Sequence, residues 1–157
     1  MDSIITQTRP LVKRLVDLYK YQLDTNNHNA TKNLSNNIQY EIHFDGITYQ
    51  VYFLLEKYWK WLEYGRKPGK QPPIASIEEW IKVKRIVPRA INGKLPTTKQ
   101  LAFAISKSIG EHGTLAYEPL KKAIGSSEAT SIIQEIKNTI INEINNEIKD
   151  AIKPISK

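Results

Sequence analysis

The sequence of 157 residues predicts an α+β fold, in which an antiparallel β-hairpin or small sheet packs with several helices and the last helix is long. Two patterns carry this prediction. Apolar and polar residues alternate over residues 38–54, which is the period of a half-buried strand pair. Isoleucines recur every three or four positions over residues 128–152, which is the period of an amphipathic helix.

The first expected element is a helix over residues 3–23, where leucine, valine and tyrosine recur at spacings of three and four. Pro10 is expected either to end a first turn or to start the main part of this helix, because proline is tolerated in the first turn. The Asn- and Ser-rich residues 24–37 predict a polar loop.

The alternating segment predicts a β-hairpin whose two strands meet at Asp45-Gly46, because glycine accepts the positive φ of a two-residue turn. The apolar residues expected on one face are Ile38, Tyr40, Ile42, Phe44, Ile47, Tyr49, Val51 and Phe53. For the next segment, residues 55–65, the period does not decide between a third strand and a short helix. Three prolines and a glycine in residues 66–73 predict an exposed loop.

Four helices are expected after that loop, over residues 75–86, 97–108, 119–124 and 128–152. The spacing of Ser76 and Glu79 predicts a capping box for the first of them, and Thr97 with Gln100 predicts another for the second. Ile77, Trp80 and Ile81, with the apolar stem of Lys84 as a further candidate, are the expected buried side of the first helix. Gly125 is expected to end the third helix.

The net charge of +7 is concentrated in the middle of the chain. Residues 56–107 hold twelve basic and four acidic side chains, whereas residues 1–55 are neutral and residues 108–157 carry a net charge of −1. Such a zone favours a polyanionic partner, either nucleic acid or an acidic protein face. A solvated surface neutralised by the terminal segments explains it equally well.

Residues with catalytic or metal-binding chemistry are scattered. The chain has no cysteine, and His28, His43 and His112 do not have the spacing of metal ligands. Glu41, His43 and Asp45 share one side of a strand, but we interpret them as its solvent face. The sequence contains no phosphate-binding loop, nucleophile elbow or catalytic triad. We therefore expect no catalytic, cofactor-binding or metal site, and a protein that is not an enzyme.

Residues 65–70, Gly-Arg-Lys-Pro-Gly-Lys, are basic and follow the aromatic residues Trp59, Trp61 and Tyr64. A basic extended loop of this kind can lie along phosphates or enter a minor groove, and Gly-Arg-x-Pro is similar to an AT-hook core. The interpretation that we favour is a proline-stiffened connector that positions the next helix. No apolar run approaches the length needed to cross a membrane, so no membrane partner is expected.

Two segments carry recognisable motifs. The first runs Tyr58-x-x-Trp61-Leu62-Glu63-Tyr64-Gly65-Arg66-x-Pro68-Gly69-Lys70-x-Pro72-Pro73-Ile74-x-x-Ile77-x-x-Trp80-Ile81-x-x-Lys84. The second runs Gly113-Thr114-x-x-Tyr117-x-Pro119-Leu120-x-x-Ala123-Ile124. Together they resemble the small neck and tail-completion proteins of tailed bacteriophages, the head–tail connector family. The resemblance covers roughly residues 40–125, and two features depart from it: the N-terminal helix has little to match, and the isoleucine-rich helix continues past the family's usual ending.

The resemblance implies a structural virion protein assembled in the host cytoplasm, a subunit of a six- or twelve-fold ring in the neck. Its implied partners are other copies of itself, the portal, the tail or other neck proteins, and the DNA of the channel. It divides the chain into a connector-like α+β domain, residues 1–125, and a C-terminal amphipathic helix, residues 126–157, which either belongs to that domain or extends toward a partner. The residues expected to make contacts are Trp59, Trp61, Tyr64, Arg66, Lys67, Lys70, Ile136, Ile140, Ile144 and Ile148.

Two other functions stay open at this point. A small basic nucleic-acid-binding protein would use the basic middle third of the chain. A small nuclease or other enzyme is the third alternative, and only the missing set of catalytic residues argues against it.

Overall fold

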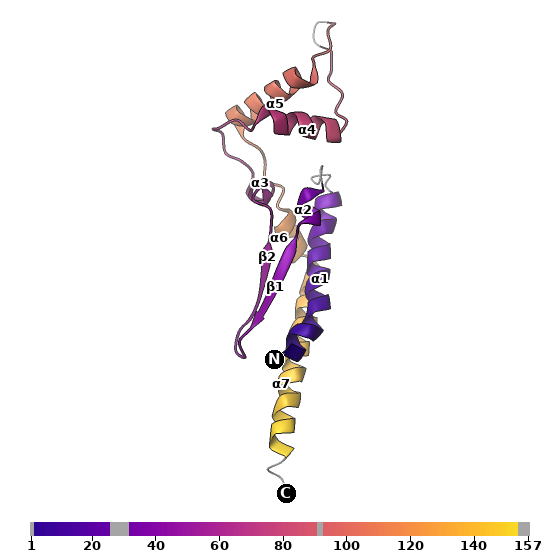
Figure 1. Cartoon of the computed structure of the whole chain (residues 1–157), viewed down its shortest axis with the longest axis vertical. Helices are drawn as coiled ribbons and strands as arrows, with labels where there is room; N and C mark the ends of the chain where they lie inside the picture. The colour runs from indigo at the N-terminus through magenta and orange to yellow at the C-terminus, as the bar shows by residue number, and fades with distance from the viewer. Residues whose placement is uncertain (1, 26–31, 91–92, 154–157) are drawn as a thin grey trace. The chain divides into compact units, whose positions relative to one another are not determined.

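The computed structural model describes residues 2–25, 32–90 and 93–153 (Figure 1). Within these ranges it contains seven helices and one antiparallel two-stranded hairpin, so the α+β prediction with a long final helix is confirmed. The elements are α1 (Asp2–Thr25), α2 (Asn33–Asn36), β1 (Gln39–Phe44), β2 (Tyr49–Leu54), α3 (Trp59–Tyr64), α4 (Ile74–Val83), α5 (Thr98–His112), α6 (Pro119–Ile124) and α7 (Ser127–Ile152).

The chain forms two compact units. Unit 1 comprises Met1–Thr25, Ile38–Leu55 and Pro119–Lys157, and unit 2 comprises Asn26–Asn37 and Glu56–Glu118. The net charge is divided unequally between these two units. Unit 2 has thirteen Lys and Arg against six Asp and Glu, which is the whole net charge of +7, whereas unit 1 has ten of each. The expected division at residue 125 stays a prediction.

Unit 1 is built on α1 and α7, which lie side by side with the hairpin along them (Figure 1). Val12 of α1 and Ile132 and Ile136 of α7 are buried together. The apolar residues of the hairpin that pack on this cluster are Tyr40, Ile42, Tyr49 and Val51. The hairpin and α7 thus bury the apolar faces that their sequence patterns predict, and they bury them in a shared core.

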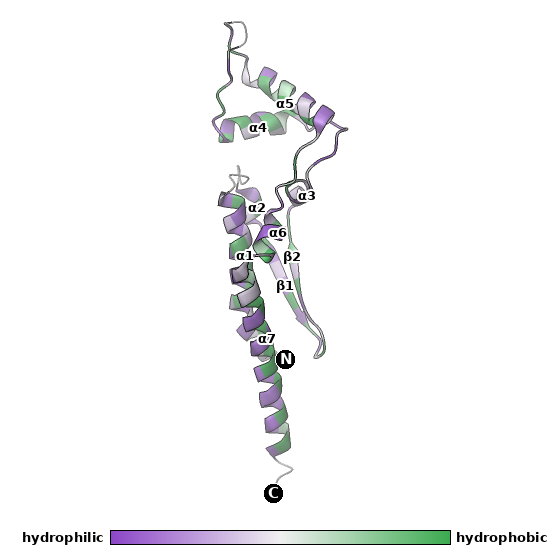
Figure 2. Ribbon diagram, turned by 180° about the vertical axis from the view of Figure 1, so that it is seen from behind, coloured by the Kyte–Doolittle hydropathy of each residue, from purple (hydrophilic) through white to green (hydrophobic). Residues whose placement is uncertain are grey.

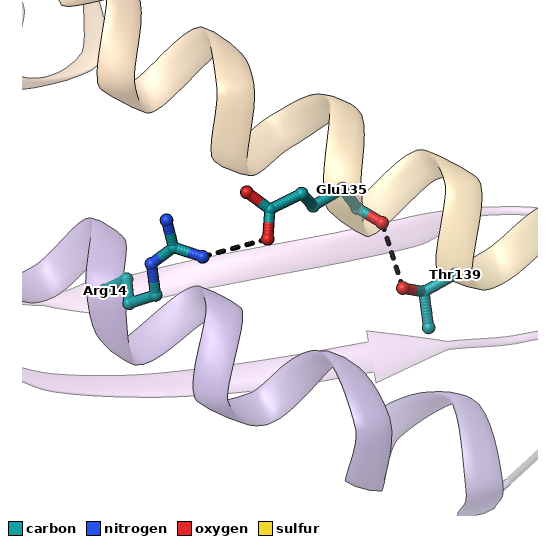
Figure 3. Close-up of polar contacts among 3 residues, drawn as sticks. All are labelled: Arg14, Glu135 and Thr139. Carbon is teal, nitrogen blue, oxygen red and sulfur yellow. Dashed lines mark hydrogen bonds and ion pairs between the residues drawn. The ribbon is translucent and has the colours of Figure 1, made fainter.

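Polar contacts join the exposed edges of α1 and α7. The Arg14 guanidinium of α1 contacts the Glu135 carboxylate of α7 at 2.9 Å (Figure 3). Within α7, the Thr139 hydroxyl donates to the Glu135 carbonyl at 2.9 Å (Figure 3). The Ser3 hydroxyl donates to the Glu143 carboxylate at 2.8 Å, so the two helices are antiparallel. The Arg14–Glu135 pair is nearly half exposed and contributes at most about 1 kcal/mol, so the buried apolar residues hold the helices together.

Pro10 has neither of its expected roles, because α1 begins at Asp2 and continues through the proline. Proline removes one helical hydrogen bond. The turns before it are held by packing, since Ile4 and Thr8 are fully or almost fully buried. The Thr8 hydroxyl also donates to the Ile4 carbonyl at 2.7 Å and accepts from the Tyr49 hydroxyl at 2.7 Å.

The hairpin pairs with a register different from that of an Asp45-Gly46 turn. Phe44 pairs with Tyr49, and the Asp45 N–H donates to the Thr48 carbonyl at 3.4 Å, so Gly46 and Ile47 are the two central residues of the turn. Gly46 has a φ of +93°, as a turn with glycine in its first central position requires. The Asp45 carboxylate accepts from the Ile47 and Thr48 N–H groups at 2.8 and 2.6 Å, which stabilises this arrangement. Ile47, expected on the apolar face, is consequently 94% exposed.

Asp45 makes the turn sensitive to acid. The Thr48 and Ile47 N–H groups lower the pKa of its carboxyl below the ordinary value of 3.8. Because the folded pKa lies below the unfolded one, the stabilisation is fully present above pH 3.8 and is lost as the pH falls through the folded pKa. We expect NMR titration of the Asp45 carboxyl carbon to show this lowered midpoint. In Asp45→Asn the Ile47 and Thr48 amide shifts should lose their acid transition, and a transition that persists would contradict the assignment.

In unit 2 the undecided segment forms the short helix α3. The helix after the loop, α4, has no capping box at Ser76, because it begins earlier, at Ile74. The Pro73 carbonyl accepts from the Ser76 and Ile77 N–H groups at 3.2 and 3.3 Å, so Ser76 lies inside the first turn. The expected buried side is only partly correct, since Ile81 is buried but Trp80 is 39% exposed.

The remaining helices agree more closely with their sequence patterns. The capping box of Thr97 and Gln100 is present on α5, although this helix extends to His112 rather than residue 108. The bounds of α6 are those expected. The start of α7 differs by one residue, and the Ser126 hydroxyl caps it by accepting from the Ala129 N–H at 3.1 Å.

Candidate assembly interface

Helix α3 presents aromatic side chains on the surface of unit 2. Trp61 is 54% exposed and Tyr64 is 73% exposed. Trp59 is half-buried, and its ring lies 5.9 Å from that of Tyr64 at a tilt of 57°. We call Trp59, Trp61 and Tyr64 the aromatic strip; two of its three rings remain open to a partner.

Arg66 connects the aromatic strip to the basic loop that follows. Its guanidinium lies over the Trp61 ring, 5.1 Å from the centroid, and donates to the Lys70 carbonyl. A cation–π contact at an exposed site is worth about 0.5–1 kcal/mol. The two contacts hold the Arg66 side chain against its own chain, whereas Lys67 and Lys70 are exposed. This geometry favours a connector over a loop that inserts its arginine into a groove.

The loop of residues 65–72, which we call the braced loop, is fixed along its length to the end of α5. Arg66 and Thr114 form an antiparallel bridge, with N–H to carbonyl distances of 3.1 and 2.8 Å. The Gly69 N–H donates to the Gly110 carbonyl at 2.7 Å. The buried Ser106 hydroxyl donates to the Pro72 carbonyl at 2.7 Å. These bonds replace those that proline and loop geometry deny to the segment.

Three glycines permit this close approach. A Cβ at Gly113 would overlap the Arg66 carbonyl, and one at Gly65 would lie 2.5 Å from the Thr114 carbonyl oxygen. A Cβ at Gly110 would lie 2.6 Å from Cγ of Gln71. Gly65 and Gly113 also have φ angles of +70° and +75°, which side chains disfavour. The glycines are therefore a structural requirement of the braced loop.

The chain returns to α3 after the bridge. The Tyr117 and Glu118 N–H groups donate to the Leu62 carbonyl at 2.9 and 3.3 Å. The segment between the bridge and these bonds contains two exposed apolar residues, Leu115 at 80% and Tyr117 at 42% exposure. The two bonds hold this segment beside α3. Neither residue was among the contact residues predicted from the sequence. The available signal was that both lie between Thr114 and Pro119, within the second of the two motif-bearing segments.

The isoleucines predicted as contacts on α7 do not share one environment. Ile136 is buried in the core of unit 1, Ile140 packs against that core, Ile144 is half-buried and Ile148 is 51% exposed. A step of four residues advances about 40° around a helix, so a series with this spacing turns from the core toward solvent. Ile141 and Ile152, which were not singled out, are 55% and 52% exposed.

Unit 1 also contains an apolar cavity of about 140 Å³. Its lining residues come from α1, β2, α6 and α7: Leu15, Tyr19, Phe53, Leu120, Ala123, Ile124 and Ile133. A space of this size holds a small apolar group, but its walls offer no charged side chain to orient one.

The described residues hold no group of three His, Asp or Glu side chains placed to bind a metal ion. Glu41 and His43 approach to 3.5 Å on the exposed face of β1, and the Asp45 carboxylate is bonded to its own turn. His28 lies outside the described residues, and His112 ends α5, where its Nδ1 lies 3.1 Å from the Ser108 carbonyl. Among the described helices, none is long and apolar enough to span a bilayer.

Comparison of the chain with protein-family models, curated proteins and solved structures finds no match.

Proposed function

We propose that this protein is a structural subunit of a tailed-bacteriophage neck, which forms a six- or twelve-fold ring between portal and tail. It has a mechanical role in this proposal and carries out no reaction. The observation that supports the proposal best is the braced loop, which holds an exposed aromatic and basic surface in a fixed geometry.

The two sequence segments that resemble the neck family meet in unit 2. Arg66 from the first segment pairs with Thr114 from the second. The Leu62 carbonyl from the first accepts hydrogen bonds from the Tyr117 and Glu118 N–H groups, which both belong to the second segment. Residues that are far apart in the sequence thus form one local structure in unit 2.

The composition of this surface suits a protein partner. Tyrosine, tryptophan and arginine are enriched in protein interfaces and dominate their binding energy. Trp61 and Tyr64 are exposed, and the brace limits the conformational entropy that they would lose on binding. The contact residues proposed on this surface are Trp59, Trp61, Tyr64, Arg66, Lys67 and Lys70.

A second contact surface is proposed on the distal part of α7. Residues 145–153 are all exposed, and hydrophobic and hydrophilic residues alternate along these turns (Figure 2). Ile141, Ile144, Ile148 and Ile152 follow spacings of three and four, which places them on one side of the helix. An isolated helical extension of this length is marginal in water, so a partner that covers the isoleucines would stabilise it.

The double variant Trp61→Ala/Tyr64→Ala tests the first surface. Because both side chains are exposed, we expect a change of less than about 1 kcal/mol in the free energy of unfolding. We expect incorporation of the variant into particles to fall at least tenfold, since loss of two interface aromatics costs about 2 kcal/mol or more. Quantitative mass spectrometry of purified virions, made in cells that supply only the variant, measures the incorporation.

The matched control is Tyr21→Ala/Tyr52→Ala, which removes two exposed aromatic residues from unit 1. It should be incorporated as well as the unmodified protein. Equal losses for both double variants would show that the aromatic strip has no special part in assembly. Absence of the unmodified protein from purified virions would refute the virion assignment itself.

A further inference from the structure

Unit 2 contains a long stretch of sequence without acidic side chains, which is separate from the aromatic strip. Between Glu79 and Glu111 the sequence contains no Asp or Glu. The basic residues in this interval are Lys82, Lys84, Arg85, Arg89, Lys94, Lys99 and Lys107. They lie at the end of α4, in the described part of the connection after it and along α5, and we call these seven basic residues the basic arm.

The charges of the basic arm are available to a ligand. All seven basic residues are exposed except Lys84, which is half-buried and has an interaction of its own. Lys107 lies 3.8 Å from Glu111. Among the described residues, no ion pair involves Lys82, Arg85, Arg89, Lys94 or Lys99. Five like charges without counter-charges repel one another, and a bound polyanion would relieve that repulsion.

Helix α5 adds an aromatic residue to this surface. Lys99, Phe103 and Lys107 are spaced four residues apart, so they lie along one exposed side of the helix, and Phe103 is 52% exposed. Ala102 and Ser106, which border this row on the helix surface, are buried within unit 2. The two lysines are about 12 Å apart along the helix axis. Cations separated by an exposed ring suit a ligand with repeated phosphates and flat bases.

We propose that the basic arm is a nucleic-acid-binding surface that contacts the phosphate backbone without selecting a sequence. The inference does not depend on the virion assignment, because it rests on the charge and exposure of unit 2 alone. Nucleic acid is favoured over an acidic protein because Phe103 lies between two cations, where its ring can stack on a base. Five of the seven cations also have no acidic partner among the described residues, and such pairs would give a protein partner its register.

The experiment is a fluorescence-anisotropy titration of the full chain with a labelled 20-base-pair DNA duplex and a labelled 20-nucleotide single strand at several salt concentrations. Contacts with four to five phosphates predict that the logarithm of the affinity for the duplex falls with the logarithm of salt with a slope of about −4. In Arg89→Gln/Lys94→Gln/Lys99→Gln we expect the affinity for the duplex to fall about tenfold or more at 50 mM salt. The slope should become shallower by about 2.7.

The matched control, Lys13→Gln/Lys137→Gln/Lys149→Gln, removes the same charge from exposed positions of unit 1. It should bind DNA within about twofold of the unmodified chain. Equal weakening in both triple variants would overturn the proposal, since net charge alone would then explain binding. It would equally be overturned by absence of binding at 50 mM salt, or by poly-glutamate of matched charge competing as well as the unlabelled duplex.

Discussion

Replacing Gly113 with alanine is expected to destabilise unit 2 by about 3 kcal/mol or more. Two costs add at this position. Alanine disfavours a φ of +75°, and its Cβ would overlap the Arg66 carbonyl oxygen. Relief of the overlap requires the Arg66–Thr114 bridge to open, which leaves the braced loop without its first two backbone hydrogen bonds. Urea unfolding, with hydrogen exchange of the Arg66 and Thr114 amides as a local probe, measures both effects.

Gly93→Ala is a closely matched control for this variant. Gly93 has a φ of +74°, nearly that of Gly113, but a Cβ there meets nothing within 4 Å among the described residues. We expect it to cost about 1 kcal/mol, the strain of the backbone conformation alone. The difference between the two variants then isolates the close approach of the chains. If the two variants were equally stable, the bridge at Arg66 and Thr114 would not exist as described.

Replacing Ile132 with alanine is expected to lower the free energy of unfolding of unit 1 by about 3–4 kcal/mol. Ile132 is fully buried against Val12 and the hairpin, so the substitution removes apolar contacts and leaves a cavity. The loss is a large fraction of the stability of a typical small domain. Thermal and urea unfolding followed by circular dichroism would measure it.

Ile148→Ala makes the same chemical change on the same helix, at a side chain that is 51% exposed. Its expected effect on the isolated chain is below about 0.5 kcal/mol, partly because alanine favours helix. A large destabilisation would mean that the distal turns of α7 pack within the chain. If the second proposed contact is correct, this variant should instead reduce incorporation into virions.

Part of the charge distribution could be predicted from the sequence, and part could not. The excess of basic residues in the middle third is visible without coordinates, and the fold assigns it to one unit, leaving unit 1 neutral. The sequence singled out residues 65–70 as the basic loop of interest. The structure shows that Arg66 is bound to its own chain, whereas Arg89, Lys94 and Lys99 carry charges that no acidic side chain of the described residues pairs.

Local patterns in the sequence alone determined the kinds of element: the hairpin from its alternation, α7 from its isoleucine period and the start of α5 from its capping box. Each depends on residues within a few positions of one another. Tertiary structure decided the rest. Helix α1 passes through Pro10 because buried neighbours hold its first turns, and the glycines at 65, 110 and 113 have their role because α5 approaches a loop some forty residues earlier. Such choices depend on which distant segments meet, and no local period encodes that.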